Sequence, residues 1–144
     1  MRGRAIRAFL GDRRGATAVE YAILAPLFFL LVFGVIEYGR MVWTAEAIQE
    51  TATVAARCIA LQGAECTTAA TPTSYTATLA QQYGVFAATT ASVTTATTLS
   101  CGAGDQSFLR VTIAVPFSSP IGTLLPGLNQ TLTAAACFPI APAT

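Results

Sequence analysis

An uninterrupted apolar stretch near the N-terminus constrains the fold more than any other feature of this sequence. Tyr21–Ile36, YAILAPLFFLLVFGVI, contains no charged residue. Counted from Gly15, with Glu20 as the one charge inside it, the stretch has 22 residues, which as a helix would span about 33 Å. Since the hydrocarbon layer of a bilayer is about 30 Å thick, the stretch predicts one membrane-spanning helix. The alternative is a buried core helix of a soluble protein.

The charges are distributed unevenly around this stretch. Residues 1–15 hold five of the eight arginines and have a net charge of +4, whereas the rest of the chain has a net charge of −3. A basic segment directly before a span predicts a cytoplasmic N-terminus, so we expect residues 38–144 outside a bacterial inner membrane. Basic segments also bind nucleic acid, but membrane orientation explains this one better, and we expect no nucleic-acid partner.

A secretory signal peptide is a second interpretation of the same region. Ala45-Glu46-Ala47 has the small-residue pattern of a signal-peptidase site. The apolar stretch is longer than the roughly 7–15 residues usual in such peptides, and the site lies well beyond its end. These two departures favour a span that is retained.

The composition excludes most enzyme classes. Charged residues make up 10% of the chain, against about 25% in typical soluble domains. Histidine is absent, which removes imidazole as a general base or metal ligand, and the sequence contains no phosphate-binding or dinucleotide motif. We expect no enzymatic activity, no catalytic residue, no metal and no cofactor.

Helical periodicity continues beyond the span. It predicts an amphipathic helix that runs to about Gln62 and ends at Gly63. Inside the span, Pro26 predicts a kink or a locally melted turn, because proline lacks an N–H and clashes with the preceding turn. Tyr38 and Trp43 suit the outer membrane interface or ordinary helix packing. The amphipathic pattern consists of the polar stripe Glu46, Glu50, Thr53 and Arg57 and the apolar stripe Ile48, Ala52, Ala55 and Ile59.

The C-terminal half has the pattern of a small α+β region. Thr73 or Ser74 caps a predicted short helix that ends at Gly84. The Thr-rich residues 91–100 are a strand or a disordered linker, and 108–117 alternates like a strand. A turn over 102–105 joins these two into a hairpin, and a last strand follows around 130–138.

Four cysteines follow the span, at positions 58, 66, 101 and 137. No two of them have the close spacing of a zinc site, and outside the cytoplasm disulfides are favoured. Four cysteines allow three pairings. We expect Cys58–Cys66, which closes the turn after the helix, and Cys101–Cys137, which ties the last strand to its neighbour in the sheet.

A composite motif precedes and enters the apolar stretch. Arg13-Arg14 is followed by Gly15-Ala16-Thr17-Ala18-Val19-Glu20-Tyr21 and then by the apolar residues. This pattern resembles the prepilin processing site of type IV-like pilins, in the form used by the Flp/Tad branch. The wider stretch 14–57 is similar to the TadE-like family of minor pilins and pseudopilins.

The resemblance implies specific roles for these residues. A membrane prepilin peptidase would cut between Gly15 and Ala16, and would leave the helix attached. Glu20, followed by Tyr21, would face the terminal amine of a neighbouring pilin subunit. Partners would then be the peptidase, other pilin-like subunits and the inner membrane.

Together these features predict a pilin-like α+β protein with four regions. They are a basic leader (1–15), a transmembrane segment (16–37), an amphipathic helix (38–62) and a disulfide-stabilised region (63–144) that packs a small antiparallel sheet on the helix. The expected function is that of a minor pilin or pseudopilin of a Tad/Flp-type pilus, acting in initiation, priming or assembly. The alternatives are a signal-anchored envelope protein or binding module and a pseudopilin of a related secretion system.

Overall fold

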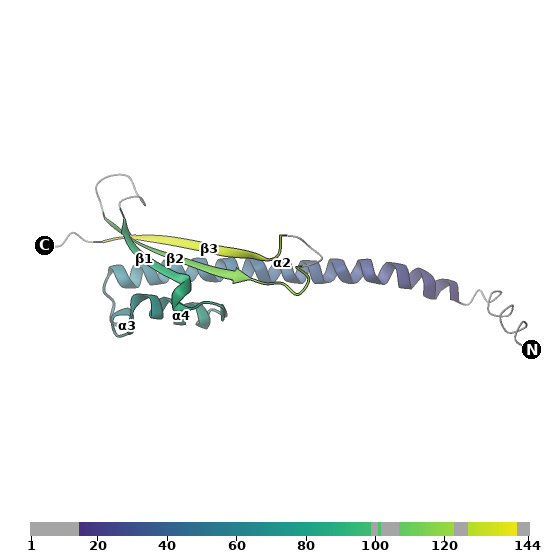
Figure 1. Ribbon diagram of the computed structural model, residues 1–144, viewed down its shortest axis with the longest axis horizontal. Coiled ribbons are helices and arrows are strands. Elements are labelled where there is room, and N and C mark those ends of the chain that lie inside the picture. The colour runs from purple at the N-terminus through teal and green to yellow at the C-terminus, as the bar shows by residue number, and fades with distance from the viewer. Residues whose placement is uncertain (1–14, 99–100, 102–106, 123–126, 141–144) are drawn as a thin grey trace, which may run out of the picture. The chain divides into compact units, whose positions relative to one another are not determined.

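The computed structural model describes residues 15–98, 101, 107–122 and 127–140. The basic leader before Gly15 and the predicted turn at 102–105 therefore lie outside the described residues. The chain divides into two compact units, 1–36 and 37–144. Its first element is the helix α2, Ala16–Ala60, which extends from one unit into the other (Figure 1).

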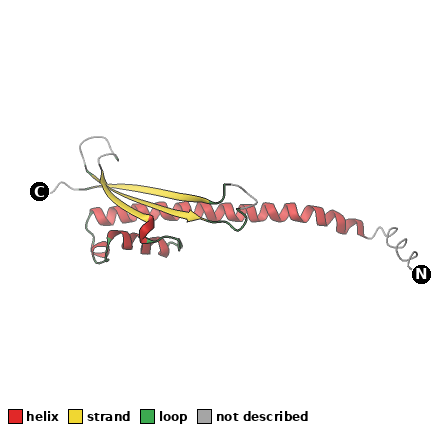
Figure 2. Cartoon of the chain, viewed as in Figure 1, coloured by secondary structure: helices red, strands yellow, loops and turns green. Residues whose placement is uncertain are grey.

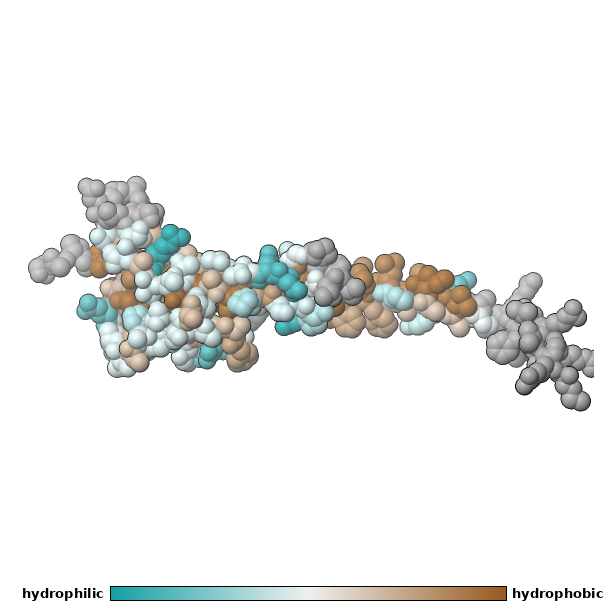
Figure 3. Space-filling model, in the orientation of Figure 1, coloured by the Kyte–Doolittle hydropathy of each residue, from teal (hydrophilic) through white to brown (hydrophobic). Residues whose placement is uncertain are grey.

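The described part of the first unit is the apolar beginning of α2. Its large side chains are exposed, and brown, hydrophobic residues cover this part of the helix in Figure 3. A window of α2 reaches a mean hydropathy of 2.3 with none of it buried. A helix this long and this apolar on all sides is suited to cross a membrane, and it suggests a membrane anchor.

Pro26 lies inside α2, and the chain is helical on both sides of it. The melted turn that was one of the two expected outcomes is therefore not observed, and the kink stays a prediction. Helices tolerate an internal proline when neighbouring groups satisfy the carbonyl that it leaves free.

The second unit contains a three-stranded antiparallel sheet of order β1-β2-β3 (Figure 2). The strands are β1 (Val93–Thr98), β2 (Phe108–Phe117) and β3 (Gln130–Pro139). The hairpin predicted from the sequence is confirmed, because β1 pairs with β2 from Val93↔Ile113 to Thr98↔Phe108. The linker alternative for the Thr-rich segment is wrong, since this segment supplies β1. At Pro116 the central strand has a partner on the β3 side alone, which fits a residue without an N–H.

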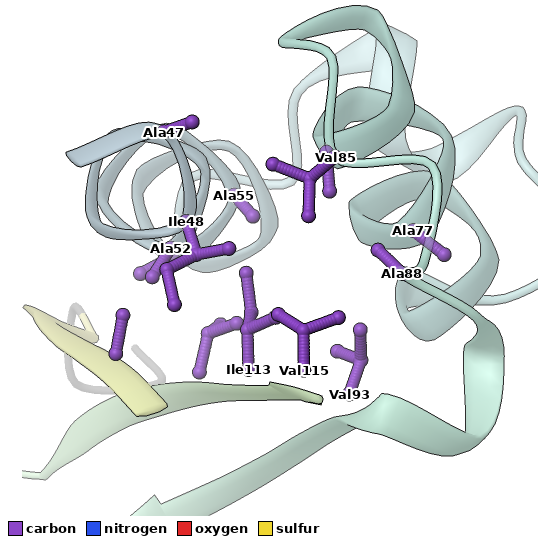
Figure 4. Packing of buried hydrophobic residues seen from close by; sticks show 14 residues of the cluster. Ala47, Ile48, Ala52, Ala55, Ala77, Val85, Ala88, Val93, Ile113 and Val115 are labelled. Atoms are coloured by element: carbon purple, nitrogen blue, oxygen red, sulfur yellow. The ribbon is translucent and has the colours of Figure 1, made fainter. Parts of the chain in front are cut away.

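The core lies between α2, the sheet and the helix α4 (Pro72–Gln82). Figure 4 shows Ile48, Ala52 and Ala55 of α2 facing Ile113 and Val115 of β2. The predicted apolar stripe of the amphipathic helix is therefore confirmed as its buried face, and the polar stripe is exposed. The alanines let the helix approach the strands closely. A long helix packed on an antiparallel sheet makes the structure α+β, as expected.

The residue that ends α2 differs from the prediction. The helix stops at Ala60, and the left-handed conformation belongs to Gln62 (φ 52°), whereas Gly63 caps the short helix α3 (Ala64–Thr67) with φ −59°. Space is tight at Gly63, because a Cβ there would lie 3.1 Å from Cys58 Sγ. The disulfide next to the helix, which sequence periodicity does not report, sets this requirement.

The cap of the next helix also differs. Thr71, and neither Thr73 nor Ser74, is the N-cap of α4: its side chain accepts from the Ser74 N–H, and the Ser74 hydroxyl oxygen accepts from the Thr71 N–H. Pro72 follows at the first helical position, where its missing N–H costs nothing. The predicted end is confirmed, since Gly84 has a positive φ of 86° after the last turn.

We predict that much of the stability of the second unit comes from the contact between α2 and the sheet. Ile113 is completely buried against α2, so Ile113→Ala should lower the free energy of unfolding by about 2–5 kcal/mol. Urea titration of the full chain in detergent, followed by near-UV circular dichroism, measures the change. Leu61→Ala is the matched control, because Leu61 is exposed and should cost less than about 0.5 kcal/mol. Equal midpoints for the two variants would contradict the packing described.

Candidate functional site

The predicted processing motif lies at the start of α2. Gly15 is exposed and directly precedes the first residue of the helix, and a side chain added there would meet no atom within 4 Å. Glu20 and Tyr21 follow on exposed positions of the first two turns. The structure therefore leaves open space beside Gly15 and exposes the side chain of Glu20.

Glu20 makes no ion pair or hydrogen bond with any residue that the structure describes. Arg13 and Arg14, which could neutralise it within the chain, lie outside the described residues. A carboxylate at the border of an apolar stretch is costly to leave unpaired in a low-dielectric environment. Its position therefore fits a carboxylate whose counter-charge comes from outside this part of the chain.

The second unit begins with a buried carboxylate that sequence reasoning missed. Glu37 is 8% exposed, and its Oε1 accepts a hydrogen bond of 2.7 Å from Nη1 of Arg40. Ser119 lies beside the carboxyl group, and Oε2 is buried without a hydrogen-bond partner among the described residues. The i, i+3 spacing to Arg40 is a signal that could have revealed the ion pair, but not the burial.

Burial of Glu37 depends on the connection between β2 and β3. The Ser119 N–H donates to Oδ1 of Asn129 at 2.8 Å, and this bond joins the two ends of the connection. Nε2 of Gln130 lies 3.1 Å from Sδ of Met41, one turn along α2. These contacts hold Ser119 and Gln130, at the two ends of the connection, against α2 where the second unit begins.

Two shallow grooves flank the segment 83–87, which follows α4. One has a volume of about 300 Å³ and is lined by Arg40, Thr44 and Phe86 among others. The other, of about 260 Å³, lies between Trp43 and Tyr83. Arg40 also stands 5.9 Å from the ring centroid of Phe117, within the range of a cation–π contact. The second groove is also lined by Glu46 and Glu50 of the exposed polar stripe.

The cysteines are paired as the sequence analysis favoured. Cys58 is bonded to Cys66 and Cys101 to Cys137, and no cysteine among the described residues is free. The described residues also contain no cluster of three or more metal-ligating side chains. The sulfur atoms therefore serve as cross-links in this structure.

Tyr75 is the titratable group of the second unit that packs against the core. Burial raises the pKa of its phenol, and the carboxylate of Glu65 and the neighbouring Tyr83 act in the same direction. The phenol therefore stays protonated near neutral pH and acts as part of the packing.

Comparison with known families identifies the N-terminal third of the chain. A model of the TadE family, described as TadE-like protein, matches residues 15–57. The comparison with curated proteins found no match, and neither did the comparison with solved structures. The resemblance inferred from the sequence is thereby confirmed for 15–57, and it is consistent with a TadE-like protein of the Tad pilus system. The matched segment is less than half of the chain.

The two disulfides should differ in their effect on stability. They close loops of 8 and 36 residues, for which chain entropy gives about 2.5 and about 4 kcal/mol. The double variant Cys101→Ser/Cys137→Ser should therefore lose more unfolding free energy than Cys58→Ser/Cys66→Ser. Urea titrations of both full-length variants in detergent measure the difference, with reductant on the unmodified protein as the control. An equal loss, or the reverse order, would contradict this prediction.

Proposed function

We propose that this protein is a minor pilin or pseudopilin of a Tad/Flp-type pilus, processed by a prepilin peptidase and acting in initiation, priming or assembly of the fibre. The observation that carries the proposal is the TadE-like match over 15–57, which contains both the Gly15–Ala16 bond and Glu20. The apolar start of α2 supports it, because such a helix can pack against other pilin-like helices.

Processing is supported by the exposure of the cleavage region. Gly15 is exposed and has open space around it, which leaves this end of the helix accessible to a protease. Cleavage after Gly15 would remove the +4 charge of residues 1–15. It would also create an α-amino group at Ala16, which with a pKa near 8 is largely cationic at neutral pH.

Assembly would use this new amine and Glu20. A cation and a carboxylate attract strongly where the dielectric constant is low, and either one alone is penalised there. A pair formed between the amine of one subunit and Glu20 of another would therefore fix the register of two helices. The lack of a partner for Glu20 among the described residues supports this intermolecular role.

The proposed topology follows from the same features. The helix would cross a bacterial inner membrane once, with the N-terminus in the cytoplasm and the second unit outside, where disulfides form. The role would be structural and not enzymatic, and the partners would be the peptidase and other pilin-like subunits. The globular part would add to the surface of the fibre or of its base.

Processing is tested by the mass of the mature N-terminus. The chain is expressed with and without a prepilin peptidase, and a start at Ala16 is expected when the peptidase is present. Gly15→Val should abolish this cleavage, whereas Gly39→Val, at an open position within the same helix, should leave it intact. An intact leader in all samples would indicate a signal-anchored envelope protein, and a start at Ile48 would indicate a conventionally secreted domain.

Assembly is tested separately through Glu20. Glu20→Ala should be cleaved almost as well as the unmodified chain but should be incorporated poorly with its pilin partners, because the amine would lack its counter-charge. Co-purification with those subunits, and fractionation of sheared fibres, measure incorporation. Glu46→Ala removes the same charge from an exposed helical position and serves as the control. Normal incorporation of Glu20→Ala would rule out the amine pairing while leaving processing untouched.

A further inference from the structure

The groove of about 260 Å³ is formed mainly by one exposed face of α2. Its lining consists of Trp43, Glu46, Ala47, Gln49 and Glu50 of the helix and Tyr83 after α4. Ile48 packs against Ile113 of the sheet (Figure 4), and Glu46 and Glu50 each lie two residues from Ile48. Two residues turn a helix by about 200°, so the carboxylates lie on the side of α2 that faces away from the sheet.

The opposite wall of the groove is held in place by the end of α4. The N–H of Tyr83 donates to the carbonyl of Leu79 at 3.1 Å, and the N–H of Val85 donates to that of Ala80 at 2.9 Å. Between them Gly84 has a positive φ of 86°, which turns the chain after the helix. The groove is therefore preformed, and binding in it needs little ordering of the protein.

The groove combines aromatic rings with two carboxylates. Trp43 is 72% exposed and Tyr83 40% exposed, so both rings are available for contact. Glu46 and Glu50 stand one turn apart, repel each other and make no ion pair with any residue that the structure describes. The six residues that line the groove include no cation. A guanidinium or ammonium group would gain from the rings and from the carboxylates together.

Arg110 is an exposed cation that matches this groove. It is the one charged residue of the three strands, and it makes no ion pair within the described part of the chain. Its cross-strand neighbours Ala96 and Cys137 are small and exposed. The next residue, Val111, is completely buried. Since successive side chains of a strand point to opposite faces, Arg110 lies on the sheet face that is turned away from α2.

The groove and Arg110 cannot meet within one molecule. The groove is on the far side of α2 from the sheet, and Arg110 is on the far side of the sheet from α2. Both layers lie between them, and a helix alone is about 10 Å thick. Contact therefore has to join two molecules. Because two different faces meet, such a contact is heterologous and can repeat from copy to copy.

The heights of the two groups along α2 are compatible with this contact. β3 follows α2 in the same direction, and Nε2 of Gln49 donates to the carbonyl of Ala135. Cys137, opposite Arg110, lies two residues farther along β3, which is about 7 Å. Two parallel copies would then be offset by little more than one helical turn, and most of the two surfaces would still face each other.

We propose that the groove of one copy receives Arg110 of a second copy of this chain, in a repeating head-to-tail contact. The guanidinium would lie against the rings of Trp43 and Tyr83 and pair with Glu46 and Glu50. This inference goes beyond the proposed function and rests on the second unit alone. It requires neither membrane crossing, nor cleavage, nor the pairing proposed for the start of α2.

The charges of the second unit favour a second copy over another basic protein. Its cations are Arg40, Arg57 and Arg110. Arg40 is paired with Glu37, and Arg57 belongs to the polar stripe of α2, the element that carries the two carboxylates. One chain thus presents both halves of a complementary pair on opposite faces. A different cation in the groove is an alternative result of the test.

A zero-length cross-link tests the contact in the full chain in mild detergent. The sequence contains no lysine, so Arg110→Lys keeps the charge and introduces a single side-chain amine. A carbodiimide activates a carboxylate, which this amine attacks to form an amide. We expect covalent dimers in which peptide masses join position 110 of one copy to Glu46 or Glu50 of another. Arg57→Lys, also exposed, is the control and should give about fivefold less dimer, because the reaction requires direct contact.

Charge reversal tests the same pairing without a cross-linker. Arg110→Glu alone, and Glu46→Arg/Glu50→Arg alone, should each lower the association constant about tenfold or more, because like charges would meet. A single change at Glu46 leaves Glu50 and both rings in the groove, which is why both carboxylates are reversed. A mixture of the two variants should associate again, since each supplies the complement that the other lacks.

Sedimentation velocity in detergent measures this association, and near-UV circular dichroism checks the fold of each variant. The apolar stretch is identical in all samples, so its contribution cancels. Arg57→Glu is the control and should associate like the unmodified chain.

Three results would overturn the inference. The first is a dimer yield with Arg110→Lys no greater than with Arg57→Lys, and the second is a mixture of charge-reversed variants that fails to associate. The third is a loss of association with the reversed carboxylates but not with Arg110→Glu, which would assign the groove to a different cation. None of them would touch the proposed function, which is tested by cleavage and by Glu20.

Discussion

The fold depends on one helix whose surface changes character at Glu37. Before this residue α2 is apolar on all sides and none of that window is buried, and after it one face packs under the sheet while the other carries charges. An α-helix can serve both environments because it satisfies its backbone hydrogen bonds internally. The side chains alone then decide which part suits lipid and which part suits a protein core.

The core that forms on the second part is built largely from small residues. Among the large side chains that are fully buried, the apolar ones are Ile48, Ile113, Val111 and Val115, and most of the remaining core is alanine. Alanine allows close packing but removes little apolar area from water, and the stabilisation scales with that area. The two disulfides therefore contribute a share of the stability of this unit that larger buried side chains would contribute in other domains. Such disulfides would form outside the cytoplasm, as the proposed topology requires.

The helices and strands could be predicted from the sequence because each depends on a repeating pattern among neighbouring residues. The alternation of 108–117 gave the bounds of β2, and the stripe that contains Ile48 and Ala52 gave the buried face of α2. The details that were missed depend either on contacts between distant residues or on competition between neighbouring residues for the same role. Three neighbouring hydroxyls could cap α4, and Pro72 at the first helical position made Thr71 the cap.

Gly63 and Glu37 show that contacts between distant segments cannot be predicted from local patterns. A sulfur atom of Cys58 leaves little space for a side chain at position 63. Ser119, which lies more than 80 residues along the chain from Glu37, packs beside the Glu37 carboxyl group. Neither requirement can be read from neighbouring residues, because each arises only when distant segments meet. The proposed processing motif is the opposite case, since the residues that would carry it are contiguous in the sequence.

The two carboxylates that bound the apolar stretch have opposite environments, and in the proposed function one would serve folding and the other assembly. Glu37 obtains a cation from Arg40 and is enclosed by the protein, so its charge is compensated within the subunit. Glu20 is exposed and has no such partner among the described residues. Because an uncompensated charge is penalised more as the surroundings become less polar, Glu20 gains most from an external cation when its helix is surrounded by other apolar helices. In the proposed assembly, this distribution of charge would let the subunit fold alone and still favour one register in a bundle of helices.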